Sequence, residues 1–179
     1  MRHVAFLRKV NVGGRGLVKM ADLQQAFTAA GAKNVRTVIA SGNVVFDAPT
    51  AALGELRRRI HQKVNALLGT DAVIVLRTFP YLERLIDAAP FGALVNDRSL
   101  KLYVLFLSGK PKQLPSFPIA IPKELLEVPG MHEQDALIVS RRKPSGMYGF
   151  PGLWTDKDLG VASTARTWST IVRIVNRPT

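Results

Sequence analysis

Apolar positions in the first 79 residues recur with two different spacings, and each spacing predicts a different kind of element. The run His3–Val10 is apolar on both faces, which predicts a central β-strand. Stripes of apolar residues with helical spacing predict helices at Met20–Ala30 and Ala51–Leu68, each followed by a glycine suited to a helix end. Short runs of β-forming residues predict three more strands, at Val35–Ile39, Val44–Phe46 and Ala72–Phe79.

The predicted order of elements in this first half is β-α-β-β-α-β. That order is typical of a ferredoxin-like unit, in which two helices cover one face of an antiparallel sheet. We therefore predict an α+β fold whose first subdomain covers residues 1–79. Residues 80–179 are predicted to form a second α+β subdomain packed on the first, within one compact domain overall, and they have room for another unit of the same type.

The second half has a less regular pattern. Tyr81–Ala88 is predicted as a short helix that stops before Pro90, and Leu100–Leu107 as the most apolar strand of the chain. Four prolines in Gly109–Pro122 predict an extended connector. Two further elements are a hairpin of Val128–Met131 with Ala136–Ser140 and a short helix near Leu153–Leu159.

A final helix is predicted to begin at Ser163 or Thr164, because both are good N-cap residues, and to run to Val175. Its inward face would carry Trp168, Ile171, Val172 and Val175. A polar stripe with spacing i, i+4, i+7, i+11 would lie opposite, made of Arg166, Thr170, Arg173 and Arg177. Such a stripe is typical of a solvated face, or of a helix that tracks phosphates.

The composition excludes several kinds of chemistry. There is no cysteine, so disulfides, thiolate nucleophiles, iron–sulfur clusters and cysteine zinc sites are excluded. The three histidines, His3, His61 and His132, show none of the spacings of a metal site, and there is no nucleophile elbow. We predict neither a metal nor a cofactor, and the sequence leaves open whether the protein is an enzyme.

Charge is the strongest compositional feature. The chain has 25 lysine and arginine residues against 13 acidic ones, for a net charge of +12. Such a field attracts polyanions through counterion release. A surface that only keeps the protein soluble explains the same numbers. We expect nucleic acid or a phosphorylated small molecule as the partner, and the oligomeric state stays open.

The sequence gives no indication of membrane association. No stretch approaches the roughly 18 consecutive apolar residues that a spanning helix needs. The first nine residues include Arg2, Arg8 and Lys9, which come too early for the apolar core of a signal peptide. We therefore expect a cytoplasmic protein that does not bind membranes.

Three ordered motifs carry a resemblance to a known family. They are Arg8-Lys9-Val10-Asn11-Val12-Gly13-Gly14 followed by Met20, then Ser41-Gly42-Asn43-Val44-Val45-Phe46, and near the end Thr164-Ala165-Arg166-Thr167-Trp168-Ser169-Thr170. Together they resemble the domain-of-unknown-function family DUF1697 over nearly the whole chain. Lys9 stands where the family has glycine, and Thr167 where it has asparagine. The resemblance implies a fold of two ferredoxin-like subdomains and no established activity.

Two of these motifs have both a functional and a structural interpretation. The glycine-rich loop with Asn11, Gly13 and Gly14 could cradle a phosphate, helped by Arg15 or Lys19, or it is only a tight loop. It lacks the endings of a P-loop and of a dinucleotide-binding fold. Ser41-Gly42-Asn43 could present an amide to a ligand, but is also a common hairpin turn.

Basic and aromatic residues elsewhere supply weaker candidates. Arg141, Arg142 and Lys143 form a basic loop that could reach a phosphate backbone, or is plain surface. Phe6 and Phe46 lie on strands where RNA-binding ferredoxin-like domains place stacking aromatics, but the flanking signature is missing and core packing explains them better.

The leading hypothesis is a non-catalytic basic module that binds a phosphate-rich partner, nucleic acid first. Arg141, Arg142 and Lys143 would be outer contacts, and the shared anion site would use Arg8, Asn11, Gly13, Gly14, Lys19, Ser41, Asn43 and Arg166. One alternative is an enzyme or small-metabolite binder whose anionic substrate is clamped by Arg8 and Arg166 in a cleft between the two halves. Another is a structural interaction protein with incidental charge.

Overall fold

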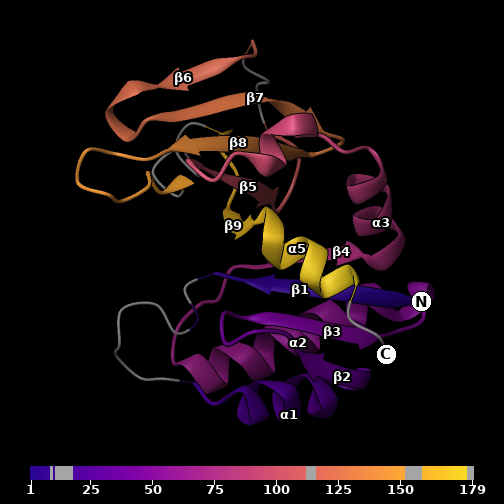
Figure 1. Cartoon of the computed structure of the whole chain (residues 1–179). Helices are drawn as coiled ribbons and strands as arrows, with labels where there is room; N and C mark the ends of the chain where they lie inside the picture. The colour runs from indigo at the N-terminus through magenta and orange to yellow at the C-terminus, as the bar shows by residue number, and fades with distance from the viewer. Residues whose placement is uncertain (9, 11–17, 112–115, 152–158, 177–179) are drawn as a thin grey trace. The chain divides into compact units, whose positions relative to one another are not determined.

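The chain divides into two compact units, Met1–Tyr81 and Leu82–Thr179. The computed structural model describes residues 1–8, 10, 18–111, 116–151 and 159–176. The boundary between the units falls within helix α3 (Phe79–Asp87). Each unit holds one antiparallel sheet, so the predicted α+β class is confirmed (Figure 1). Among the described helices, none is both long and apolar enough to cross a bilayer.

The first unit has the element order that the sequence predicts. Its elements are β1 (Arg2–Leu7), α1 (Met20–Ala30), β2 (Lys33–Thr37), β3 (Asn43–Asp47), the short 3-10 helix η1 (Thr50–Ala52), α2 (Leu53–Leu68) and β4 (Ile74–Thr78). The sheet order is β2-β3-β1-β4, and every neighbouring pair is antiparallel. Helices α1 and α2 lie together on one face of this sheet (Figure 1). This arrangement is ferredoxin-like.

The core of the first unit forms between its two helices and its sheet. Phe27 of α1, Ile60 of α2 and Phe46 of β3 are all at most 1% exposed, and they belong to one cluster of buried apolar side chains. Gly31 and Gly69 end the two helices with positive φ angles of 105° and 65°. These are left-handed conformations that glycine adopts without strain, which is why the predicted helix ends are confirmed.

Strand β1 is shorter than predicted, because it ends at Leu7 and not at Val10. The amide of Leu7 donates to the carbonyl of Gly42 at 2.8 Å, and the amide of Arg8 donates to the carbonyl of Val73 at 2.9 Å. Val10 lies beyond the end of the strand and is 3% exposed. The apolar character of Val10 therefore reflects burial and does not extend the strand.

His3 is a buried titratable group on β1. Its ring stacks on Phe46 with centroids 5.5 Å apart, and among the described residues its Nε2 atom has no hydrogen-bond partner. Burial lowers the pKa of His3 below its ordinary value of 6.5. The Ala48 carbonyl and the Asp47 carboxylate act in the opposite direction, and the Met1 ammonium adds to the lowering. The protonated ring is therefore disfavoured in the folded state.

Replacing His3 is expected to reduce the loss of stability in acid. Because its folded pKa is lowered, the unfolded chain takes up the proton more readily once the pH falls below about 6.5, and stability then falls by up to about 1.4 kcal/mol per pH unit. The variant His3→Gln should show a shallower decline between pH 7 and pH 5 in urea unfolding. The pKa of His61 is also lowered, by burial and by Arg57. The variant should therefore still lose some stability as the pH falls. An unchanged decline in the variant would contradict this assignment.

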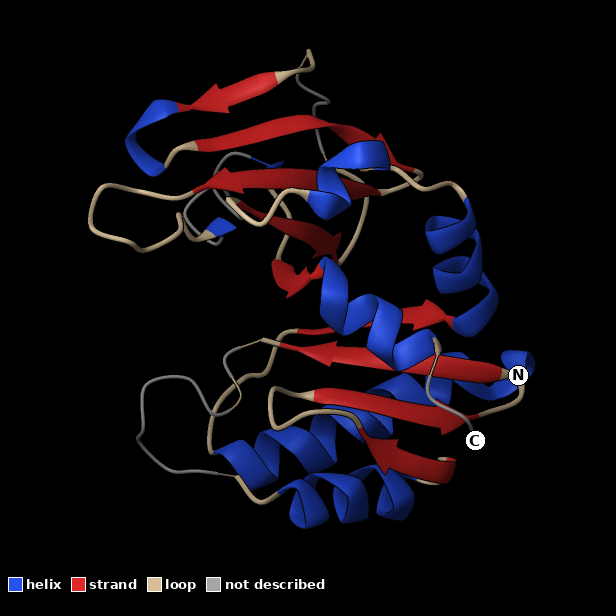
Figure 2. Ribbon diagram, in the orientation of Figure 1, coloured by secondary structure: helices blue, strands red, loops and turns tan. Residues whose placement is uncertain are grey.

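The second unit is built around a five-stranded sheet. Its elements are η2 (Gly92–Asn96), β5 (Leu100–Leu107), β6 (Ile119–Ile121), η3 (Pro122–Glu124), β7 (Leu126–His132), β8 (Asp135–Arg141), β9 (Ser163–Thr167) and α5 (Trp168–Val175), with α3 leading into it. The sheet order is β6-β7-β8-β5-β9, with antiparallel neighbours (Figure 2). Four of these strands, β7-β8-β5-β9, repeat the order of the first sheet. Between β5 and β7, the described residues form β6 and η3 where the repeated unit would have an α-helix.

The final helix begins later than predicted. Ser163 and Thr164 are not helix caps, because they belong to strand β9, which pairs with β5. The true N-cap is Thr167, whose hydroxyl accepts from the amide of Thr170 at 3.3 Å. Serine and threonine suit both caps and strands, so their presence alone does not locate the start of the helix. Among the residues expected to face inward, Ile171 is buried, as is Ile174, which the prediction omitted.

The cationic stripe predicted for this helix is also wrong. Arg166 lies on β9 and is 8% exposed, so it shares no helix face with Thr170 and Arg173. Arg177 is outside the described residues, and so is most of the predicted helix near Leu153–Leu159. The proline-rich connector is interrupted by the short strand β6, which pairs with β7.

The same corner occurs once in each unit. Arg77-Thr78-Phe79 leads from β4 into α3, and Arg166-Thr167-Trp168 leads from β9 into α5. Each arginine is 8% exposed and donates from Nη1 to the carbonyl of the residue before it at 2.7 Å. Each threonine hydroxyl accepts an amide of the following helix at 3.3 Å. The two corners also pair alike, with Val4 opposite Arg77 and Val104 opposite Arg166.

Candidate functional site

The glycine-rich motif lies largely outside the described residues, which include only its borders. Asn11, Gly13 and Gly14, together with Arg15, fall in the undescribed segment 11–17. Arg8 is half-buried at the end of β1, and Lys19 is exposed immediately before α1. The carbonyl of Lys19 accepts from the amides of Asp22 and Leu23 at 3.1 and 3.2 Å, and no side chain caps this helix. The phosphate-cradle hypothesis for this loop therefore stays a prediction.

The Ser41-Gly42-Asn43 motif forms the turn before β3, next to the end of β1. The side-chain amide of Asn43 is fully buried and donates to the carbonyl of Val38 at 2.9 Å and to the hydroxyl of Ser41 at 3.0 Å. Gly42 has a φ of +72°, and a Cβ atom there would lie 3.0 Å from Val10 and 3.1 Å from Leu7. The structure thus brings this turn beside Arg8. The Asn43 side-chain amide makes its hydrogen bonds within the turn, as the hairpin interpretation expects.

Truncating Asn43 tests whether this motif holds the fold or a ligand. In Asn43→Ala the buried carbonyl of Val38 loses its side-chain donor, which is expected to lower the free energy of unfolding by about 1–3 kcal/mol. Chemical denaturation measures this, with Ser41→Ala as the milder companion variant. Under the hypothesis that the protein binds nucleic acid, both variants should bind it as the wild type does at a temperature where they are folded. Unchanged stability together with lost binding would make Asn43 a ligand-binding residue instead.

Arg166 is a buried cation on strand β9. Its Nη1 donates to the hydroxyl of Thr164 at 2.8 Å and to the carbonyl of Ala165 at 2.7 Å. Burial lowers the pKa of Arg166 to about 10, so the side chain keeps its proton at neutral pH. These contacts order the strand and its corner. A role in clamping an anion, as in the alternative hypothesis, stays a prediction.

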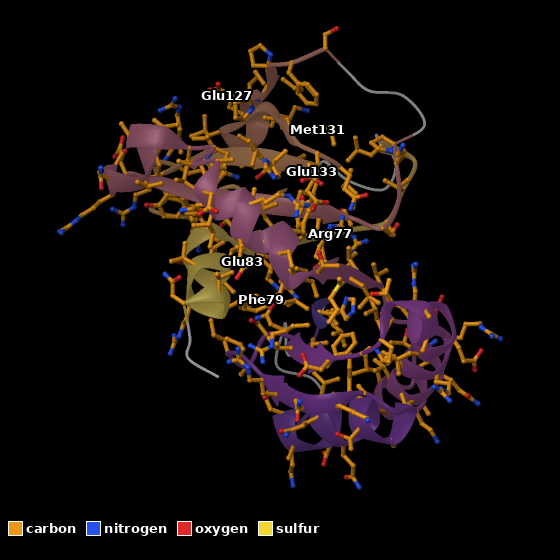
Figure 3. The ribbon with its side chains drawn as sticks, turned by 90° about the vertical axis from the view of Figure 1, so that its right-hand side faces the viewer. Arg77, Phe79, Glu83, Glu127, Met131 and Glu133 are labelled. Carbon is orange, nitrogen blue, oxygen red and sulfur yellow. The ribbon has the colours of Figure 1, made fainter. Side chains whose placement is uncertain are left out.

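The basic loop at Arg141–Lys143 is partly neutralised. Lys143 pairs with Glu124 at 2.7 Å, and Arg141 lies 3.8 Å from Glu127. Arg142 is exposed and donates from Nε to the carbonyl of Gly146 at 3.0 Å. Elsewhere in this unit Glu133 pairs with Arg84 at 3.1 Å; Figure 3 labels Glu127 and Glu133 on β7 and in the turn that follows it. Of the three predicted outer contacts, Arg142 is the one with no acidic partner among the described residues.

Surplus positive charge is concentrated in the first unit. Met1–Tyr81 contains twelve lysine and arginine residues and four acidic ones, a formal charge of +8 out of the total of +12. Three of the acids are engaged locally, since Asp47 pairs with Arg2, Glu55 pairs with Arg58, and Asp71 accepts from Asn65. Five exposed cations have no acidic partner within 4.0 Å among the described residues: Lys19, Lys33, Arg57, Arg59 and Lys63.

Helix α2 contributes three of these five cations, but not on one side. Arg57 and Arg59 are two residues apart, so they project to different sides of the helix. The guanidinium of Arg59 lies 3.5 Å from the position that a Cβ of Gly31 would occupy, at the C-terminus of α1. That helix end carries partial negative charge, which holds the arginine there. Arg59 and Lys63 are four residues apart and share one side of the helix, so a phosphate backbone could follow those two, whereas Arg57 projects to another side.

The sheet of the first unit offers no exposed stacking platform at the two rings that the sequence singles out. Phe6 and Phe46 are both fully buried, which confirms that they are core residues. Domains that read RNA on a ferredoxin-like sheet keep such aromatics accessible to bases. Binding through the sheet face in that manner is excluded for these two rings. Among the described residues, no group of three or more histidine or acidic side chains could hold a metal ion.

Two signals in the sequence would have identified residues that the prediction missed. The paired Arg-Thr-aromatic tripeptides, Arg77-Thr78-Phe79 and Arg166-Thr167-Trp168, mark Arg77 as the counterpart of Arg166. Tyr148 and Phe150 follow the basic loop closely in the sequence, which marks this segment as one that combines cations with aromatic residues. Both signals depend on comparing neighbouring residue types and not on apolar periodicity.

Comparisons with known proteins support the fold and give no activity. A family model described as a protein of unknown function, DUF1697, matches residues 1–132. A solved structure of a conserved bacterial protein from Streptococcus pneumoniae is 19% identical, with a TM-score of 0.61, and the match covers 97% of this chain and 96% of that one. With a sequence identity of only 19%, this similarity shows that the two proteins share a fold and says nothing about activity. No curated protein matches the chain.

Proposed function

The chain belongs to the DUF1697 family of proteins of unknown function, so we propose a function from its own residues: a non-catalytic module that binds a phosphate-rich partner, nucleic acid first. The observation that carries this proposal is the charge of Met1–Tyr81, which contains twelve basic residues and only four acidic ones. Three of those acids are already engaged by neighbours. Among the described residues, the exposed Lys19, Lys33, Arg57, Arg59 and Lys63 have no acidic partner within 4.0 Å, which supports their availability to an external anion.

Phosphates, and not bases, are the groups that this unit would recognise. Exposed lysine and arginine side chains at the start of α1, on β2 and along α2 can follow a charged backbone. The buried aromatics of the sheet give no readout of bases. Binding of this kind is weakly selective for sequence and depends strongly on salt, with dissociation constants of about 10⁻⁴ to 10⁻⁶ M under physiological conditions.

Fluorescence anisotropy with labelled oligonucleotides tests the proposal. At about 50 mM salt the chain should bind RNA and DNA of unrelated sequence with similar affinity, and the affinity should fall steeply by about 200 mM. An acidic protein of similar size serves as the control, because adding it should not raise the anisotropy of the labelled oligonucleotides. No binding at the lower salt concentration, or affinity indifferent to salt, would overturn the proposal.

A thermal-shift screen separates this function from the small-metabolite alternative. A ligand that binds the folded state raises the melting temperature by an amount that grows with the ratio of its concentration to its dissociation constant. RNA should raise the melting temperature, and phosphorylated metabolites at millimolar concentration should not. Stabilisation by one small anion, with none by RNA, would favour the alternative.

A further inference from the structure

A short β-hairpin extends from strand β8, and we call it the aromatic arm (Arg142–Phe150). Arg142 and Tyr148 form an antiparallel bridge, and the amide of Lys143 donates to the carbonyl of Met147 at 2.7 Å. The turn closes through a bond from the amide of Gly146 to the carbonyl of Lys143 at 2.8 Å, and Gly146 has a φ of +82°. The arm is therefore a folded hairpin with its own hydrogen bonds.

Contacts at its base fix the arm to the rest of the second unit. The hydroxyl of Ser140 donates to the carbonyl of Gly149 at 3.2 Å, and the hydroxyl of Tyr148 donates to the carbonyl of Arg98 at 3.4 Å. Lys143 pairs with Glu124, and the backbone of Glu124 lies directly against Gly149. Because the arm is already ordered, a partner that binds it loses little free energy in ordering the loop.

The arm exposes large apolar side chains beside cations. Met147 is 67% exposed and Phe150 is 62% exposed, and no other large hydrophobic side chain of the described residues is more exposed than these two. The ammonium of Lys101 lies 5.7 Å from the ring centres of both Tyr148 and Tyr103. Arg98, Lys101 and Arg142 have no acidic partner within 4.0 Å in the described part of this unit.

We propose that the aromatic arm is a stacking site for the bases of single-stranded nucleic acid, with Phe150 as the platform and Arg98, Lys101 and Arg142 as phosphate contacts. This inference rests on the proposed function and adds the class of partner. Every base has a π-face, so stacking on an exposed ring is tolerant of sequence, and neighbouring cations neutralise the backbone. A duplex keeps its bases stacked on each other, so Phe150 discriminates in favour of single strands.

A lipid surface is the less favoured occupant. Met147 and Phe150 are two side chains, whereas even a myristoyl chain alone holds a protein on a bilayer only marginally. A cation also lies beside aromatic rings at the arm, since the ammonium of Lys101 is 5.7 Å from the ring centres of both Tyr148 and the buried Tyr103. The combination of accessible aromatic rings with cations is typical of single-strand binding sites.

Phe150 variants test the inference by comparing a single strand with a duplex of equal length. Phe150→Ala should weaken single-strand binding by about 5- to 100-fold and leave duplex binding unchanged. Phe150→Leu should weaken it nearly as much, because leucine is apolar but has no π-face. Phe150→Trp should retain affinity, and its added fluorescence should be quenched by the single strand beyond any quenching of the wild-type tryptophans. Phe150 is exposed, so all three variants should fold, which circular dichroism checks.

The outcomes separate this inference from the proposed function. Salt-dependent binding by the wild type, with single-strand affinity unchanged in Phe150→Ala, overturns the stacking site and leaves the proposed function standing. Equal weakening for single strand and duplex overturns it as well. Binding to anionic phosphatidylserine vesicles that depends on Phe150, without an effect on single strands, assigns the arm to lipid. No nucleic-acid binding by the wild type overturns both proposals.

Discussion

Gly149→Ala is expected to destabilise the protein by about 3 kcal/mol, the largest effect of a single substitution that the structure suggests. An added Cβ would lie 2.0 Å from the carbonyl oxygen of Glu124, 3.0 Å from its carbonyl carbon and 3.1 Å from Leu126 Cδ2. Two of these three neighbours are backbone atoms, which cannot rotate away. The base of the aromatic arm must therefore separate from Glu124, or the strand that follows Glu124 must move.

Thermal and urea unfolding measure this effect, and the chain contains a matched control. Gly130 lies on β7 in the same unit, and nothing stands within 4 Å of where its Cβ would be. Gly130→Ala should change stability by less than about 1 kcal/mol, whereas Gly149→Ala should lower the melting temperature by roughly 10 °C. Equal stability of the two variants would show that Gly149 does not hold the arm in place.

Removing three cations from α2 is expected to weaken nucleic-acid binding at least about tenfold at 100 mM salt. The variant is Arg57→Gln, Arg59→Gln and Lys63→Gln combined. All three side chains are exposed and have no acidic partner among the described residues, and glutamine suits a helix. The effect is large because each phosphate that is no longer neutralised keeps its condensed counterion, whose release favours binding. Stability should change little.

A second triple variant controls for the total charge. Lys110→Gln, Lys123→Gln and Arg173→Gln together remove the same charge from exposed positions of the second unit, outside the aromatic arm. This control should weaken binding less than about threefold, because it alters only the long-range field. Anisotropy at one salt concentration compares the two. Equal weakening would mean that binding follows net charge, with no preference for the first unit.

The first unit could be predicted because local and tertiary preferences agree there. The apolar stripes of α1 and α2 point at the sheet, and Gly31 and Gly69 end the helices where a left-handed residue is needed. The end of β1 differs from the prediction, since Val10 is apolar for a reason other than strand pairing. A buried turn and a strand give the same apolar signal.

The second unit was harder to predict because its residues suit more than one structure. Ser163 and Thr164 have side chains that cap helices, but hydrogen bonding to β5 makes them a strand. β6 has three residues between Pro118 and Pro122, too few to show a period. Pairing with distant strands determines both elements, and a single sequence does not show which distant residues will pair.

The sequence identifies residues of the candidate site, but it does not predict what each of them does in the structure. Asn43 is engaged in its own turn and Arg166 in its own strand, two roles that motif spacing alone does not distinguish from ligand binding. The concentration of charge in Met1–Tyr81 can be counted from the sequence, but only the structure shows that Arg57, Arg59 and Lys63 lack acidic partners among the described residues. The aromatic arm depends on exposure, which composition does not give.

The dependence of binding on salt, compared between the wild type and the α2 triple variant, tests most directly whether the first unit holds the phosphates. The logarithm of the association constant for a duplex should fall linearly with the logarithm of salt concentration, with a slope shallower by about 0.9 for each phosphate that the variant no longer neutralises. If all three α2 cations bind phosphates, the slope of the variant should be shallower by nearly 3. Superimposable salt titrations for the two proteins would contradict the account.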